Sequence, residues 1–163
     1  MGTNTTSIML GSYSHFFKQD SNALRKRRKA VSQLLKLKGY SFCEINIYII
    51  AYDFFCSNPS EFDGATVVKD LCDIPGLDLD AMLHDYHYLR YRVGSSFTLK
   101  WKADWAYAKG QERKGKGQYS AFSRFVGLTI IGLVFVPYTR VKRGKLSRNQ
   151  KKEFLKEYQI LIK

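Results

Sequence analysis

A histidine, two aspartates and a tyrosine are spaced so that they could act together on one water molecule. His84 and Tyr88 lie four residues apart, which places both side chains on one face of a helix. Asp85 lies about 100° further around that helix, so its carboxylate can serve a different centre. Asp104 follows on a second helical stretch, and a short turn at Gly94 would bring the two helices together antiparallel. We therefore expect Asp104 to meet the ring of His84, with Tyr88 donating a hydrogen bond to the same carboxylate.

This set of side chains is suited to the hydrolysis of an ester. A carboxylate that binds one ring nitrogen of a histidine fixes its tautomer, and the other nitrogen can then take a proton from water. Asp85 would be a suitable ligand for a hard cation such as calcium, which polarises a carbonyl and stabilises the oxyanion. In a second interpretation the same residues form a buried polar cluster that joins two helices without turnover. The residues alone leave both interpretations open.

The two segments that carry these residues have helical patterns. Apolar residues recur at helical spacing from Leu79, and Gly94 is expected to end that run. A second helix is expected to begin near Ser96 or Thr98 and to reach about residue 109. The basic stretch 110–117 follows it and is expected to be a flexible loop, because it contains three glycines.

The rest of the chain is also expected to be helical. Ser21 could cap a helix over 21–38, and Ser147 could cap an amphipathic helix at the end of the chain. Over 41–55 periodicity does not separate a helix from a buried strand, and the length favours a helix. The segment 119–136 is apolar nearly all round, which predicts a buried helix ending before Pro137. The expected fold is mainly α: a small helical domain with an antiparallel active-site helix pair and basic helical arms.

Positive charge dominates the composition. The 163 residues include 27 Lys and Arg against 14 Asp and Glu, a net charge of +13. Such a charge favours a polyanionic partner: nucleic acid, an anionic membrane surface or an acidic neighbour in an assembly. Charge divides the chain into a basic N-terminal arm (1–57), a less basic core (58–138) and a basic C-terminal segment (139–163). The residues expected to contact a polyanion are Arg25, Lys26, Arg27, Arg28, Lys29, Arg143, Lys145 and Arg148.

Several classes of protein are excluded by the sequence. Three cysteines without paired spacing give neither a disulfide framework nor a zinc site. The longest apolar runs fall short of the roughly 20 residues that a membrane span needs. The N-terminal residues contain no secretory signal, so we expect a soluble protein made in the cytosol. No helix-turn-helix, zinc-finger or ribonucleoprotein motif accompanies the basic clusters, which would therefore bind phosphates without sequence specificity.

Three short motifs in order resemble a known family. Leu83-His84-Asp85-x-x-Tyr88, followed by Lys102-Ala103-Asp104-Trp105, resembles the active-site helix pair of phospholipase A2. The pattern is most similar to the short, disulfide-free forms in parvovirus capsid proteins. It also resembles a small phage-borne domain of unassigned function, which has an upstream Asp-Gly-Ala-Ser/Thr motif. Asp63-Gly64-Ala65-Thr66 stands in the matching place here. The resemblance covers about residues 58–138.

The resemblance implies a role for each residue of the set. His84 would be the base, Asp104 its orienting partner, Tyr88 a supporting donor and Asp85 the calcium ligand. The Gly-rich loop that completes the calcium site of phospholipase A2 has no counterpart, and the basic arms have none either. Four other aspartates could substitute as oxygen ligands: Asp63, Asp73, Asp78 and Asp80. His87 lies on another helix face and is expected to be structural or at the surface, and packing is expected for His15.

Two functions are therefore expected from the sequence. The first is a calcium-dependent, phospholipase A2-like esterase of a phage or virus, which acts on an anionic phospholipid membrane of the host. The second is a non-catalytic structural or assembly protein of a virion, whose basic arms contact packaged nucleic acid or neighbouring subunits. Either would be associated with a virion or located in the host cytoplasm.

Overall fold

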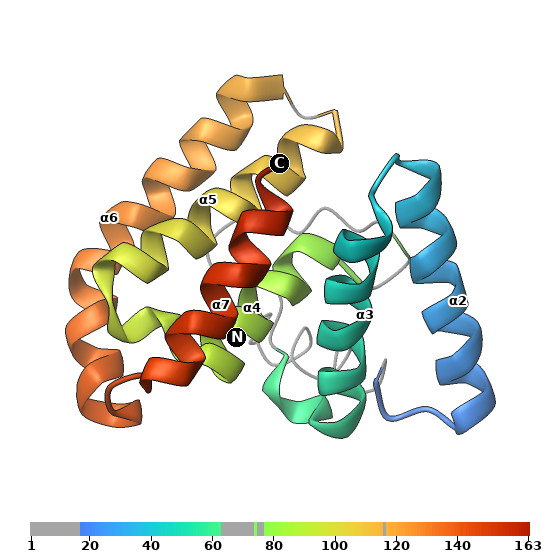
Figure 1. The fold of residues 1–163 in the computed structure, drawn as a ribbon, viewed down its shortest axis with the longest axis horizontal. Coiled ribbons are helices and arrows are strands. Elements are labelled where there is room, and N and C mark those ends of the chain that lie inside the picture. Colours follow the sequence, from blue (N-terminus) through green and yellow to red (C-terminus); the bar gives the residue numbers. More distant parts are fainter. Residues whose placement is uncertain (1–16, 63–73, 75–76, 116) are drawn as a thin grey trace, which may run out of the picture. The chain divides into compact units, whose positions relative to one another are not determined.

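Helices make up the described part of the chain. The structure is a computed structural model that describes residues 17–62, 74, 77–115 and 117–163, without the side chains of residues 135, 139, 140, 142 and 143. In these ranges the regular elements are all helical, apart from an isolated bridge between Ile74 and Leu77 (Figure 1). The elements are α2 (Ser21–Leu37), α3 (Phe42–Ser57), η1 (Pro59–Glu61), α4 (Leu79–Tyr91), η2 (Val93–Ser95), α5 (Phe97–Arg113), α6 (Gly117–Arg143) and α7 (Arg148–Leu161). The expected mainly α fold is confirmed.

The chain divides into two compact units, Met1–Met82 and Leu83–Lys163. The boundary falls inside α4, so the first turn of this helix belongs to the first unit and the remainder to the second. This division follows contacts between residues. The three parts expected from the sequence (1–57, 58–138 and 139–163) follow charge, which is a different criterion, and they stay predictions.

Side-chain caps determine where the helices of the first unit begin. Asp20, rather than the expected Ser21, caps α2, because its Oδ1 accepts the backbone N–H groups of Asn22 and Ala23 at 2.9 Å each. Ser41 caps α3 in a capping box, in which Glu44 accepts the backbone N–H of Ser41 at 2.8 Å. This Ser-x-x-Glu signature begins helices, so it explains why the apolar segment 41–55 forms a helix and not a strand.

Aromatic side chains fill the core of the first unit. Phe17 is buried with its ring centroid 5.7 Å from each of Tyr52, Phe55 and Phe62. This unit also contains a buried polar contact: the hydroxyl of Tyr48 on α3 donates to Asp80 at the start of α4 at 2.6 Å. The Asp80 side chain is only 2% exposed, so this hydrogen bond stabilises a carboxylate that water hardly reaches.

The contact between Tyr48 and Asp80 gives a first testable prediction. Tyr48→Phe should lower the free energy of unfolding by about 1–3 kcal/mol, because a buried carboxylate loses one of its donors. The same change at Tyr119, which is 89% exposed, should leave stability close to wild type. Urea denaturation followed by far-ultraviolet circular dichroism would compare the two. Equal stability of the two variants would contradict the structural role of this hydrogen bond.

Two helices of the second unit are longer than expected. α5 continues to Arg113, so residues 110–113 are helical and the prediction of a loop over 110–117 is wrong for them. Gly110 and Gln111 are buried within this helix, so tertiary packing outweighs the low helix propensity of glycine. α6 passes through Pro137 instead of ending before it. Pro137 is exposed, and so is Leu133, whose carbonyl loses its helical donor.

The connection between α4 and α5 also differs from the expectation. α4 ends at Tyr91, three residues before Gly94, and the left-handed backbone conformation belongs to Arg92 with φ of 52°. The short helix η2 follows, and its Val93, Gly94 and Ser95 are buried. This compact turn leads directly from the helix of His84 into the helix of Asp104.

Candidate active site

His84, Tyr88 and Asp104 meet in the second unit. His84 Nε2 on α4 lies 2.9 Å from Asp104 Oδ1 on α5, and the Tyr88 hydroxyl donates to the same oxygen at 3.1 Å. The rings of His84 and Tyr88 lie 4.6 Å apart on their shared helix face. Asp104 is fully buried, whereas the His84 side chain keeps 14% of its surface exposed. The expected contacts are therefore present. The catalytic roles of these residues and the antiparallel orientation of the helix pair stay predictions.

Asp85 lies beside the second ring nitrogen of His84. Its Oδ1 is 3.6 Å from His84 Nδ1, so it faces the same histidine rather than the separate centre expected from its helical position. Nδ1 is the ring nitrogen nearer the backbone, which explains why the short side chain of the next residue can approach it. A separation of 3.6 Å is too long for a hydrogen bond, so Asp85 acts on the ring mainly through its negative charge.

A buried lysine, which the motifs in the sequence did not predict, completes the cluster. Lys100 Nζ donates to Asp104 Oδ2 and, at 2.6 Å, to the backbone carbonyl of Leu128 on α6. Only 5% of the Lys100 side chain is exposed. In the sequence Lys100 and Asp104 form an i, i+4 pair, which is typical of a solvent-exposed helix face. In the structure α6 packs against Lys100 through Leu128 and Gly132, and His84 and Tyr88 of α4 contact Asp104, so the pair is buried.

The charges of the cluster determine its protonation. Burial by itself lowers the pKa of His84, but the hydrogen bond to Asp104 and the negative charges of Asp104 and Asp85 outweigh it and raise this pKa to about 9. Burial by itself raises the pKa of Asp104. The hydrogen bonds and positive charges of His84 and Lys100 outweigh this effect and hold the pKa below its usual value. Burial and the charge of Asp104 raise the pKa of Tyr88 well above its ordinary value, so this residue stays a hydrogen-bond donor. At neutral pH His84 is therefore protonated between two carboxylates.

His87 belongs to a different polar contact. Its side chain is buried, and Nε2 lies 3.2 Å from Glu157 Oε2 on α7. Glu157 also accepts the hydroxyl of Tyr91 at 2.5 Å. Burial lowers the pKa of His87, and the nearby carboxylate of Glu157 opposes this only in part. This arrangement agrees with a structural role for His87. The other histidine for which packing was expected, His15, lies outside the described residues.

The described residues do not make up a calcium site. Among residues 17–62, 74, 77–115 and 117–163, no three His, Cys, Asp or Glu side chains gather where a metal ion could be held. Asp78 Oδ1 accepts the backbone N–H groups of Asp80 and Ala81, and Asp80 accepts from Tyr48, so both aspartates have structural contacts. Asp63 and Asp73 lie outside the described residues. Calcium takes six to eight oxygen ligands, so its binding at Asp85 stays a prediction.

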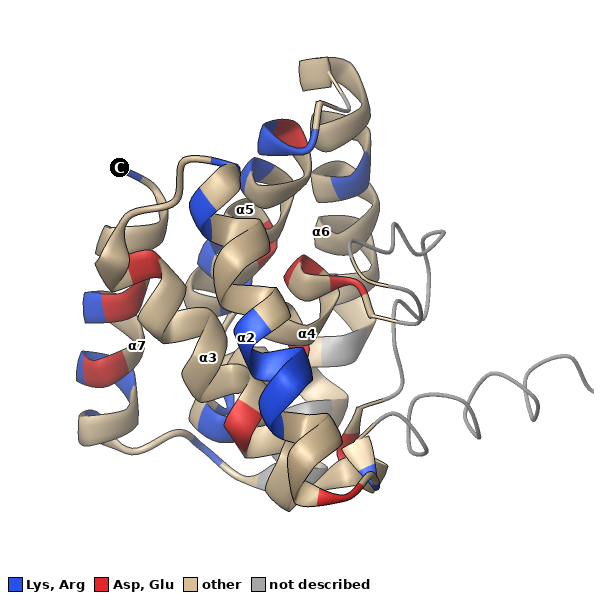
Figure 2. Cartoon of the chain, turned by 90° about the vertical axis from the view of Figure 1, so that its right-hand side faces the viewer, with Lys and Arg blue, Asp and Glu red and all other residues tan. Residues whose placement is uncertain are grey.

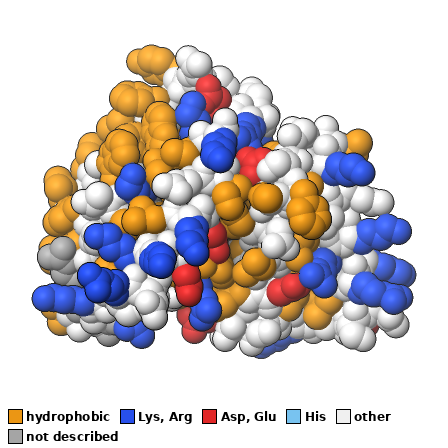
Figure 3. All heavy atoms as spheres, viewed as in Figure 1, with side chains coloured by type: hydrophobic (Ala, Val, Ile, Leu, Met, Phe, Trp, Pro, Cys, Tyr) orange, Lys and Arg blue, Asp and Glu red, His pale blue; other side chains and the backbone are white. Residues whose placement is uncertain are grey.

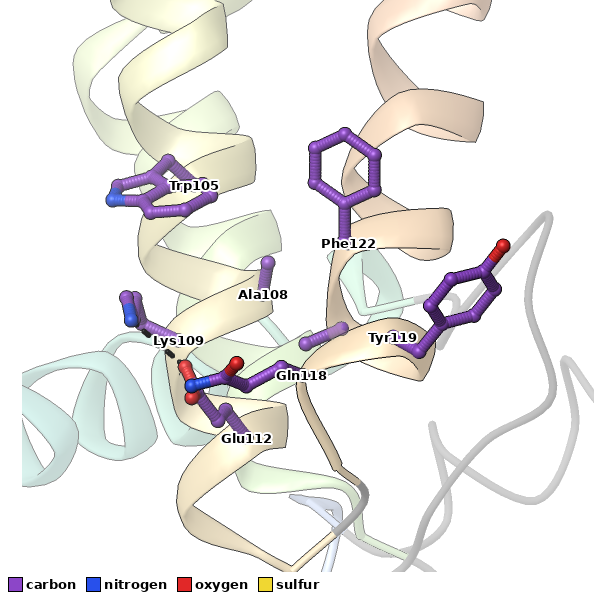
Figure 4. A pocket seen from close by; sticks show the side chains of 8 residues that line it. Trp105, Ala108, Lys109, Glu112, Gln118, Tyr119 and Phe122 are labelled. Carbon is purple, nitrogen blue, oxygen red and sulfur yellow. Dashed lines mark hydrogen bonds and ion pairs between the residues drawn. The ribbon is translucent and has the colours of Figure 1, made fainter.

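A cavity of about 420 Å³ lies between α5 and α6 (Figure 4). Trp105 and Phe122 face it from the two helices, and an ion pair of 2.8 Å joins Lys109 to Glu112 at its edge. The remaining lining residues are Ala108, Gln118, Tyr119 and Ala121. None of the lining residues belongs to the cluster around His84, so this cavity is not a channel above the histidine.

Apolar side chains lie exposed along α6. Figure 3 shows them as an extended orange area on the side of the second unit that α6 forms. We define this α6 apolar face by its exposed residues Tyr119, Phe122, Ile130, Leu133, Val134, Tyr138 and Val141. The α6 sequence contains no Asp or Glu. Within the part of the chain that the structure describes, none of the helices has the length and apolar character needed to cross a bilayer.

The basic residues expected to contact a polyanion lie on helices of both units. The N-terminal cluster belongs to α2 (Figure 2), where Arg25, Lys26, Arg28 and Lys29 are exposed and Arg27 is half-buried. Arg28 forms an exposed ion pair with Asp53 at 3.2 Å. In the C-terminal segment Lys145 and Arg148 are exposed, and the structure does not describe the side chain of Arg143. The structure therefore leaves most of these cations accessible to a ligand.

Comparisons with known proteins add no assignment. No protein-family model, curated protein or solved structure matches this chain. The resemblance to phospholipase A2 rests on the motifs around His84 and Asp104. The contacts between these residues are consistent with it, and they are the evidence from which a function is inferred.

Proposed function

We propose that this chain is an ester hydrolase of the phospholipase A2-like kind, in which His84 activates water without a covalent intermediate. The observation that carries this proposal is the contact of 2.9 Å between His84 Nε2 and Asp104 Oδ1. Tyr88 donates to the same oxygen and so fixes its position. Asp104 thereby orients the ring and leaves Nδ1 as the nitrogen that would accept a proton from water.

The hydrolytic step follows from this geometry. In neutral His84, Nε2–H donates to Asp104 and Nδ1 carries the lone pair. As the oxygen of a water molecule hydrogen-bonded to Nδ1 attacks the ester carbonyl, Nδ1 takes the proton that the water loses. The bond between the carbonyl carbon and the leaving oxygen then breaks, and Nδ1 returns the proton to that oxygen. The products are a carboxylic acid and an alcohol, and His84 regains its neutral form.

The surface of the second unit supports the proposal that the substrate is a phospholipid. An exposed apolar helix face without acidic residues is suited to lie at the boundary of headgroups and acyl chains. Exposed basic residues such as Lys145 and Arg148 would be attracted to anionic headgroups. We propose the α6 apolar face as the surface that meets the membrane.

Release of fatty acid from vesicles tests this function. Mixed phosphatidylcholine and phosphatidylglycerol vesicles would be incubated with wild-type protein, with calcium or with chelator. His84→Gln should reduce the rate by roughly 10²-fold or more, because the general base is lost. His87→Gln, the same change at the neighbouring histidine, should retain activity. No release by folded wild-type protein in either condition would contradict the proposal.

The pH dependence of the rate is a second part of this test. Because the pKa of His84 is raised to about 9, the neutral base is the minor form at pH 7. The rate should therefore rise by roughly tenfold per pH unit between pH 7 and 8 and level off above pH 9. A rate that is independent of pH over this range would show that His84 is not the base.

A second candidate function is favoured by one specific observation. At neutral pH both ring nitrogens of His84 face carboxylates, so the cluster can act purely as a buried ionic contact between α4 and α5. The chain would then be a non-catalytic structural or assembly protein, and its basic residues would contact packaged nucleic acid or neighbouring subunits. Strong destabilisation by His84→Gln, together with no hydrolysis by wild type, would favour this alternative.

A further inference from the structure

The cavity between α5 and α6 has an apolar end and a polar end. Figure 4 shows the rings of Trp105 and Phe122 at one end, and Lys109, Glu112 and Gln118 gathered at the other. Its volume of about 420 Å³ is near the lower limit for ligand sites, which enclose about 300–1,000 Å³. These properties match a slender ligand that is apolar along its length and polar at one end.

Contacts within the protein position the apolar walls of this cavity. The Trp105 ring stacks on Trp101 with 7° between the ring planes, and its centroid lies 5.3 Å from that of Phe125 in an edge-to-face contact. Ala108 and Ala121 line the cavity and form a buried core cluster with Phe125, against which Trp105 packs. The short side chains of the two alanines leave the space between the helices open. A ligand would therefore meet a preformed site lined by carbon atoms.

Lys109 offers a positive charge at the polar end. Its Nζ lies 2.8 Å from Glu112 Oε2 and 5.3 Å from the centroid of the Trp105 ring, so the ammonium is held at the edge of the cavity. An ammonium has three N–H donors, and the ion pair with Glu112 uses one of them. The sequence of α6, which forms the opposite wall, contains no Asp or Glu. A singly charged anionic head can therefore bind Lys109 without facing an acidic residue of α6.

We propose that this cavity binds one long-chain fatty acid, with the hydrocarbon chain between Trp105 and Phe122 and the carboxylate at Lys109. A fatty acid fits better than a phospholipid, because a phospholipid has two chains and this cavity has one small apolar end. Tyr119 and Phe122 also belong to the α6 apolar face, so a chain can enter from the surface expected to meet the membrane. The site is separate from the cluster around His84 and requires no hydrolysis there.

Quenching of Trp105 by a brominated fatty acid tests this site. Trp101→Phe leaves Trp105 as the only tryptophan of the chain, and circular dichroism would verify that this variant folds. Bromine quenches an indole only at short range, so stearate brominated at mid-chain should lower the fluorescence to a plateau at one molecule per chain. Unbrominated stearate should reverse the effect. Quenching without a plateau, or no quenching at all, would overturn the proposal.

Substitutions in this background locate the bound chain. Ala108→Leu should weaken stearate binding by roughly tenfold or more, because the added carbons take the space of the chain. Ala106→Leu, the same change at an alanine of α5 outside the lining, should bind as the background does. Equal affinities of these two variants would overturn the site.

A second pair of variants decides the question if Ala108→Leu does not fold. Phe122 is 58% exposed, so Phe122→Ala should fold and should weaken binding, because one wall of the cavity is removed. Leu133→Ala is the control, since Leu133 is similarly exposed on the α6 apolar face but does not line the cavity. Equal weakening in both variants would show that stearate binds the helix face in general, and would overturn the site.

Two ligands with the same chain test the polar end. Lys109→Met should weaken binding of the brominated carboxylate by about fivefold, because a partly exposed ionic contact is lost. Binding of the corresponding brominated alcohol should not change. Equal effects on acid and alcohol would overturn the place of the carboxylate at Lys109. Saturable binding by a protein that releases no fatty acid from vesicles would support this site and contradict only the proposed hydrolase.

Discussion

Asp104→Asn is expected to lower the free energy of unfolding by about 3–5 kcal/mol at pH 7. Asparagine has nearly the same shape, so the loss comes from charge rather than from packing. Lys100 and protonated His84 would remain buried without the carboxylate that pairs with both of them. The only tryptophans of the chain, Trp101 and Trp105, lie in the second unit, so their fluorescence in urea would report the unfolding of this unit.

Glu112→Gln is the matched control for Asp104→Asn. It also removes one carboxylate from a pair with a lysine on α5, but Lys109 and Glu112 keep 41% and 27% of their side-chain surface exposed. Solvent screening makes such surface pairs weak, so its unfolding midpoint should stay close to wild type. Equal midpoints for the two variants would contradict the interpretation of Asp104 as the centre of a buried ionic cluster.

Stability should fall at alkaline pH because of His84. Its pKa is raised from 6.5 to about 9 in the folded protein, so folding favours the protonated form. The resulting stabilisation is fully present below pH 6.5 and is lost as pH rises through 9. The shift corresponds to about 3 kcal/mol. Urea denaturation of wild type between pH 6 and 9.5 should show this loss, whereas His84→Gln should show little of it.

Other groups restrict the pH range in which this loss can be measured. Burial lowers the pKa of His87, so folding favours the neutral form of this residue. Its contribution to stability is therefore lost as pH falls below 6.5, whereas that of His84 is lost as pH rises. Buried tyrosines such as Tyr48 have raised pKa values, so they favour unfolding only above their ordinary pKa near 10. If the free energy of unfolding of His84→Gln decreases between pH 7 and 9.5 as much as that of wild type, the loss belongs to another group.

The contacts of the candidate site could be predicted from local spacing, but the electrostatics could not. The interval of four residues placed His84 and Tyr88 on one face, and a turn followed by a second helix brought Asp104 to them. Lys100 was missed because an i, i+4 lysine normally lies in solvent. Its burial depends on Gly132, which lies more than thirty residues further along the chain. Such tertiary contacts have no local signal in a single sequence.

The fold shows the same limit. Caps and periodicity predicted that the helices exist, as the Ser-x-x-Glu start of α3 illustrates. The ends were less predictable, because glycines near residue 110 and Pro137 normally interrupt helices. In α5 burial of Gln111 overrides that preference, and in α6 the proline faces outwards. The end of a helix depends on the residues that pack against its last turns, and these residues come from other parts of the chain.

The buried acidic residues change what an approaching polyanion would meet. Of the chain's 14 Asp and Glu, at least four are buried: Glu44, Asp78, Asp80 and Asp104. Among the described basic residues, Lys100 alone is buried to the same degree. At 0.1 M salt, charges beyond about 10 Å are screened, so a phosphate responds to the surface nearby rather than to the net charge. The effective surface is therefore more cationic than the ratio of 27 to 14 indicates, because carboxylates hold the interior together and cations face the solvent.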